Sequence, residues 1–209
     1  MTAIAEEDVG HRYADLMIEI RSRLREVEMQ LTLADGEDSK RRLVFIAEYC
    51  YIQLRRIAEL TALAILIAHN PHEEFRTNKL VTEWKPDKLL KMLGKLRPAA
   101  FPQNGIISRT PPNERVFIAA SLPTTDVRDK ICKIYTRCCD QLHVGALKSF
   151  LKSKSIYDFN EIDSFWRYLV DLLDEHVIYL PDGRMAYTKL GYPNADEVTV
   201  QWISLPDNE

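Results

Sequence analysis

The chain has 209 residues, of which 46% are hydrophobic and 28% charged, a balance typical of globular proteins. A chain of this length can bury a core without disulfides or structural metals. The formal net charge is −3, but residues 1–154 hold 25 Lys and Arg against 20 Asp and Glu, whereas residues 155–209 hold 3 against 11. The excess of positive charge in residues 1–154 is compatible with contact with a nucleic acid. The simpler explanation of the uneven charge is that the two parts attract each other or face solvent.

The composition gives no sign of export or of insertion into a membrane. Residues 1–7 are polar and acidic, unlike a signal peptide, and the longest apolar stretch, residues 60–68, is too short to span a bilayer. We therefore expect a cytoplasmic protein with no membrane partner and with free thiols. The cysteines are Cys50, Cys132, Cys138 and Cys139.

The first helix is predicted over residues 9–33. Its apolar residues, from Tyr13 to Leu31, recur every three or four positions, which is the pattern of an amphipathic helix. Asp35 and Gly36 then supply a stop and a turn.

A second helix is expected over residues 39–69, beginning near Ser39. Its first half is amphipathic, whereas residues 60–68 are apolar on every side. A helix without a polar face must be covered by other elements on most sides. Pro71 prevents the helix from continuing beyond His69 and Asn70.

Two shorter helices are expected in the middle of the chain. Residues 86–96 form the first, with Pro86 in its opening turn, where proline is tolerated. The second ends near residue 143, and either Thr124 or Thr125 can cap it. Residues 146–151 are expected to continue it as a helix.

Residues 97–123, between these two helices, are expected to form a long loop. Five prolines interrupt the segment, and only residues 116–120 have the composition of a short strand. A loop of this length is either functional or partly mobile.

The end of the chain changes in character. A helix is expected over residues 160–176 with Asn160 as its cap. Residues 177–180 and 184–190 flank a Pro-Asp-Gly turn and predict a β-hairpin, and residues 198–203 alternate like a third strand.

These elements predict a mainly α fold, a helical bundle with a small C-terminal antiparallel β-sheet. The bundle domain would take residues 1–176, and residues 177–209 would form a small hairpin or three-stranded appendage packed on the bundle. The long helix over residues 39–69 would organise the whole.

Several catalytic and cofactor signatures are missing from the sequence. It contains no phosphate-binding Gly-rich loop, no HExxH, no CxxC pair and no GxSxG, and it has only seven glycines. A nucleotide cofactor is therefore not expected. The cysteines and His143 fit no closed zinc pattern, so we expect neither a metal site nor another cofactor.

Arg137, Asp140 and His143 form the first candidate site. An Arg can hold a phosphate with two hydrogen bonds, and a His can move a proton near neutral pH, so the pair could act on RNA. Asp140 lies about one helical turn before His143 and could orient it. The alternative, which spacing alone favours, is that Arg137 and Asp140 form an ordinary pair three residues apart and His143 merely ends the helix.

Arg55, Arg56 and Glu59 form a second candidate, a binding site on the long helix. They lie where this helix becomes apolar on all sides, so each charge needs a partner there. A structural ion pair is one explanation. The other is a polar site that these residues share with Arg137 and His143.

Two segments resemble parts of uncharacterised bacterial helical proteins. In residues 51–69 an Arg and a Glu precede an apolar run that ends in Ala-His, and residues 135–145 contain a Tyr, a Cys and then Leu-His-Val-Gly. The pair of helices, over residues of about 40–150, resembles the HEPN superfamily. That resemblance implies a helical bundle that is often dimeric, with ribonuclease members that use an Arg, a short spacer and a His.

Arg137 and His143 would carry that ribonuclease motif here. Catalytic members usually have a polar residue directly after the Arg, whereas this chain has Cys138. The first hypothesis is therefore a HEPN-like module that acts through binding or dimerisation without catalysis, and we expect a homodimer. The alternative is a metal-independent ribonuclease of toxin or defence type, with RNA as partner, Arg137 as phosphate clamp and His143 as acid and base.

Overall fold

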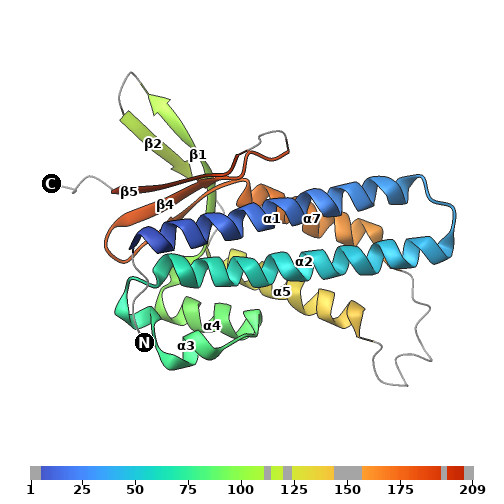
Figure 1. The fold of residues 1–209 in the computed structure, drawn as a ribbon, viewed down its shortest axis with the longest axis horizontal. Coiled ribbons are helices and arrows are strands. Elements are labelled where there is room, and N and C mark those ends of the chain that lie inside the picture. The colour runs from blue at the N-terminus through green and yellow to red at the C-terminus, as the bar shows by residue number, and fades with distance from the viewer. Residues whose placement is uncertain (1–5, 111–113, 120–123, 144–156, 194–196, 205–209) are drawn as a thin grey trace.

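Two long antiparallel helices, α1 (Glu6–Asp35) and α2 (Lys40–His69), run side by side along the long axis of the molecule (Figure 1). The computed structural model describes residues 6–110, 114–119, 124–143, 157–193 and 197–204. The predicted mainly α fold with a small antiparallel sheet is confirmed. No helix among the described residues is long and apolar enough to cross a membrane.

The helix α2 is the central element, and other helices surround most of it. Its first turn is capped by Ser39, whose hydroxyl accepts the N–H of Arg42 at 3.5 Å, so the predicted start is confirmed. In its last nine residues only Leu63 is exposed. The prediction that the apolar half is covered on most sides is therefore confirmed.

The covering helices are α4 (Pro86–Leu96), α5 (Thr124–Leu142) and α7 (Phe159–Leu173). All three contact α2, and α7 also contacts α1. Short pieces η1 (Glu73–Phe75) and α3 (Asn78–Thr82) join α2 to α4, and η2 (Pro98–Ala100) follows α4. The bounds of α4 agree with the prediction, whereas the expected helix over residues 146–151 lies outside the described residues.

The prediction for the last helix was wrong at both ends. Asp158, and not Asn160, is the cap, because its carboxylate accepts the backbone N–H groups of Asn160 and Glu161 at 3.0 and 3.2 Å. The helix ends at Leu173 and not at residue 176, because the next strand already begins at Glu175.

The sheet has five antiparallel strands in the order β2-β1-β3-β4-β5. The strands β3 (Glu175–Tyr179), β4 (Arg184–Lys189) and β5 (Thr199–Ser204) are the predicted hairpin and third strand, with small shifts of their ends. The other two, β1 (Gln103–Thr110) and β2 (Glu114–Ala119), lie within residues 97–123.

The expectation of a loop over residues 97–123 was therefore wrong for much of this segment. The predicted short strand is present as β2, but its partner β1 was not expected, since its sequence mixes polar and apolar residues without alternation. Backbone pairing explains β1: it pairs with β2 from Gly105↔Ala119 to Thr110↔Glu114 and meets β3 at Gln103↔Val177.

A buried polar chain ties α1 to the sheet. The Tyr13 hydroxyl lies 2.9 Å from Nε2 of His176, whose Nδ1 lies 2.9 Å from the carbonyl oxygen of Leu173, and Thr188 donates its hydroxyl to Tyr13 at 3.4 Å. Because that carbonyl only accepts, Nδ1 carries the proton and Nε2 accepts from Tyr13. All three side chains are fully buried, so His176 is held neutral, and burial lowers its pKa to about 4.

This neutral histidine makes the stability depend on pH. In the unfolded chain His176 takes up a proton near its ordinary pKa of 6.5, whereas in the folded protein it does so near 4. The stability that the neutral ring contributes is fully present above pH 6.5 and is lost as the pH falls towards 4. This loss lowers the free energy of unfolding by about 3 kcal/mol over this range. Urea denaturation at a series of pH values should show this loss. A His176→Gln variant should lose about half of the slope between pH 6.5 and 4, because burial also lowers the pKa of His69 to about 4 and this second ring keeps its share.

The exposed His143 provides the matched control. His143→Gln makes the same chemical change at an exposed position, and it should keep the wild-type slope. Equal slopes for wild type and His176→Gln would contradict the assignment of the slope to the buried ring.

Candidate functional site

Arg137, the candidate phosphate ligand, lies on α5 and is held by a carboxylate. Its Nε lies 2.9 and 3.0 Å from the two carboxylate oxygens of Glu161 in the first turn of α7. The hydroxyl of Tyr51 on α2 donates to the same carboxylate at 2.9 Å. The pKa of Tyr51 is raised, mainly by burial and then by this hydrogen bond. Glu161 therefore joins three helices, and the charge of Arg137 is compensated within the protein.

A shallow groove of about 380 Å³ contains this pair. Arg137, Asp140 and Glu161 line it together with residues from α4 and from the start of α5. The lining holds three cationic side chains and four carboxylates. A phosphate in this groove would meet at least as much negative as positive charge, which disfavours anion binding.

His143 does not share this groove. It is the first residue after α5, its ring is exposed, and its backbone N–H is bonded to the carbonyl of Cys139 at 3.1 Å. Six residues along an α-helix correspond to a rotation of about 240° beyond one full turn, so the positions of Arg137 and His143 point in different directions. The structure brings Arg137 and Asp140 to one groove and leaves His143 outside its lining.

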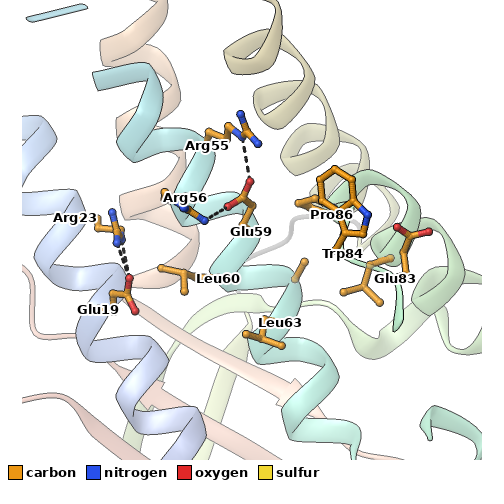
Figure 2. Close-up of a pocket in the computed structure, with 12 residues that line it drawn as sticks. Glu19, Arg23, Arg55, Arg56, Glu59, Leu60, Leu63, Glu83, Trp84 and Pro86 are labelled. Atoms are coloured by element: carbon orange, nitrogen blue, oxygen red, sulfur yellow. Dashed lines mark hydrogen bonds and ion pairs between the residues drawn. The ribbon is translucent and has the colours of Figure 1, made fainter. Parts of the chain in front are cut away.

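Arg55, Arg56 and Glu59 lie in a second, larger pocket of about 690 Å³ (Figure 2). Arg55 donates from Nε to one oxygen of Glu59 at 3.0 Å, and Arg56 donates from Nη1 to the other at 2.8 Å. The guanidinium of Arg55 also lies over the ring of Tyr135 on α5, 5.7 Å from its centroid. The ion pairs expected between these residues are thus present.

The two sets of candidate residues belong to different pockets. None of Arg55, Arg56 and Glu59 lines the groove of Arg137, and Arg137 and His143 are absent from the larger pocket. The structure therefore does not bring the two sets into one pocket. The helices α2 and α5 are in contact, but these charged residues line separate pockets.

The larger pocket includes residues that the sequence reasoning missed. On α1, Arg23 is paired with Glu19 at 2.6 Å and donates to Gln53 of α2 at 2.6 Å. On the opposite side Trp84, in the connection between α3 and α4, is 72% exposed. The signal that could have found it is a Trp directly before Lys-Pro in a helix-breaking segment, where no core position is expected.

The cysteines belong to no metal cluster among the described residues, and two of the thiols are held protonated. Among the described residues no three His, Cys, Asp or Glu side chains gather in a way that could hold a metal ion. Burial raises the pKa of both Cys50 and Cys138 to about 12, which keeps these thiols protonated and unreactive.

No family model, curated protein or solved structure matches this chain. The resemblance to the HEPN superfamily therefore depends on the two sequence segments described above. The two pockets described above therefore carry the inference about function.

The contribution of the hydrogen bond between Tyr51 and Glu161 to stability can be measured by mutation. Tyr51→Phe removes one hydrogen bond and should lower the free energy of unfolding by about 1 kcal/mol. Glu161→Gln weakens the bonds to both Tyr51 and Arg137 and should cost about 1–2 kcal/mol. In a double-mutant cycle measured by urea denaturation, the two changes should couple. The double variant should lose less free energy of unfolding than the sum of the losses in the two single variants.

Asp163→Asn is the matched control on the same helix. Asp163 also pairs with an arginine, Arg167, at 2.7 Å, but that arginine is 66% exposed. Its neutralisation should cost no more than about 0.5 kcal/mol. Strict additivity of Tyr51→Phe and Glu161→Gln would show that Glu161 does not link α7 to Tyr51 of α2.

Proposed function

We propose that the protein is a HEPN-like helical module that acts through binding or dimerisation, without catalysis. The observation that supports this proposal most strongly is the carboxylate of Glu161 on Arg137, at 2.9 and 3.0 Å. The residue that would clamp a phosphate in a ribonuclease already has an anionic partner. His143, which would be the acid and base of such a ribonuclease, lies outside the groove that Arg137 lines.

Displacing Glu161 by a phosphate would be costly. The carboxylate would lose its ion pair with Arg137 and its hydrogen bond from Tyr51, and the fully buried Tyr51 would be left without an acceptor. The carboxylates around the groove would also repel the incoming anion. These terms favour a structural role for Arg137, in which it fixes α7 against α5.

The alternative function is a metal-independent ribonuclease with RNA as its partner. One observation favours it: the side chain of His143 is exposed at the end of α5 rather than buried among apolar side chains, so it is open to contact with RNA. In that mechanism Arg137 would have to leave Glu161 and hold the phosphate. His143 would act as acid and base, supplied by the same chain or by the second copy in a dimer.

Either function would be carried out in the cytoplasm. In support of this, all four cysteines are free, and Cys138 and Cys139 are adjacent on one helix without a disulfide.

An RNA-cleavage assay separates the two functions. Wild type, Arg137→Ala and His143→Ala should all give the background rate with single-stranded, hairpin and structured RNA. His11→Ala, which removes another exposed histidine, is the control for traces of contaminating nuclease. Cleavage by wild type and by His11→Ala that falls at least about 100-fold in both Arg137→Ala and His143→Ala would overturn the non-catalytic proposal.

A further inference from the structure

The helix α2 leaves one straight line of its surface uncovered. After its first turn, and with all of its residues described, the exposed positions are Phe45, Tyr49, Ile52, Arg56 and Leu63. They are spaced by four, three, four and seven residues, so they all project from one side of the helix. Four of the five are large and apolar, with exposed fractions of 39–59%. An apolar line of this kind marks a site of association.

The line is symmetric about the level of residue 54. Phe45 and Leu63 are equally distant from this level, on either side, and so are Ile52 and Arg56. Two copies of α2 that pack antiparallel about a two-fold axis at this level would therefore bring Phe45 of each copy to Leu63 of the other. A two-fold interface requires this reciprocity, in which each residue meets its partner twice.

We propose that a second copy of this chain docks on this face, with α2 antiparallel to α2, and that Phe45 of each copy enters the larger pocket of the other beside Leu63 and Trp84. The inference depends on the proposed function and names the partner and the surface of that binding module. The surface is distinct from the groove of Arg137, which lies between α4, α5 and α7.

The pocket suits an aromatic side chain. Figure 2 shows Leu63 on α2, between Glu19 and Arg23 of α1 on one side and Trp84, on the connection that leads to α4, on the other. Leu60, Pro86 and Leu89 add further apolar surface. Trp84 is 72% exposed, and a phenyl ring packed against it would remove apolar area of both rings from water.

The charges on the line are compensated and do not oppose this arrangement. Arg56 is already paired with Glu59 at 2.8 Å, so its burial leaves no single uncompensated charge. Opposite Arg56 the second copy would present Ile52, on which the aliphatic part of the arginine can lie. Opposite Glu59 it would present Tyr49, which is also five residues from the axis and whose hydroxyl is hydrogen-bonded to Glu26 of its own chain.

The area indicates a weak dimer. From Phe45 to Leu63 the line is about 27 Å long. The neighbouring helix α1 exposes Met29 and Leu33, and the bond between Arg23 and Gln53 places them near the level of Phe45. A face about 20 Å wide would give roughly 500 Å² per copy, below the ~800 Å² of a standard interface. We expect a dissociation constant of the order of 10 µM or above.

Sedimentation equilibrium across the micromolar range tests the surface. Wild type should change from monomer to dimer with increasing concentration, and Leu63→Glu should weaken the dimer by at least about tenfold. Leu96→Glu is the matched control, since Leu96 is 47% exposed against 41% for Leu63 but lies at the far end of α4. It should dimerise like wild type. Circular dichroism checks that each variant is folded.

Cross-linking tests the antiparallel register. In a Phe45→Cys, Leu63→Cys double variant, a short bis-maleimide should join two chains. Each single variant should give only the wild-type background, because the two copies of residue 45 would be about 27 Å apart. Cross-linked dimer from either single variant would overturn the register. A monomer at all concentrations, or equal weakening by Leu63→Glu and Leu96→Glu, would overturn the surface.

These outcomes differ from those of the RNA-cleavage assay. Cleavage that requires Arg137 and His143 would refute the non-catalytic function and leave the dimer measurable. A monomeric wild type without cleavage would refute only the docking surface.

Discussion

A helix that is apolar on every side must be surrounded, and α2 imposes this condition on the rest of the chain. From residue 60 onwards it cannot face water without exposing a large apolar area, which costs about 25 cal/mol for each Å². The helices α1, α4, α5 and α7 all contact it, and beyond its first turn they leave only one line of its surface exposed. Because four elements must reach one helix, the charged residues on their inner faces need partners, and these partners come from distant segments.

The pairing of Arg137 with Glu161 follows from this crowding. Both side chains lie where α5 and α7 meet α2, and Tyr51 from α2 completes the contact. Arg55 finds Glu59 on its own helix and the ring of Tyr135 on the next. Each candidate arginine thus stabilises the bundle. The surfaces left for binding are those where α2 is not covered, which is why the apolar line and not the arginines is the basis of the proposed interface.

Local patterns predicted the helices well. The spacing of apolar residues in α1 and α2, Pro86 at the start of α4 and Ser39 before α2 are all short-range signals, and the elements lie close to where these signals place them. The strand β1 has no such signal, since its pairing with β2 and β3 determines its conformation. The cap at Asp158 was missed because Asn160, two residues on, is an equally good capping residue by type.

The candidate sites were harder to predict for a similar reason. The sequence identified Arg55, Arg56, Glu59 and Arg137, but which of them share a pocket depends on how α5 is rotated against α2. That rotation depends on long-range packing and on Glu161, which is 24 residues from Arg137 in the chain. Spacing within one helix cannot reveal it.

The bond between Tyr13 and His176 joins residues that are 163 positions apart. On a ribosome, α1 is complete long before β3 and β4 have been made, so Tyr13 has no acceptor and the face around it has no sheet to cover it. Closing so large a loop is slow, since the loss of chain entropy precedes the gain from the contact. The part of α1 around Tyr13 must therefore wait for nearly the whole chain to be synthesised, and until then this part of the helix is open to chaperones and to other nascent chains.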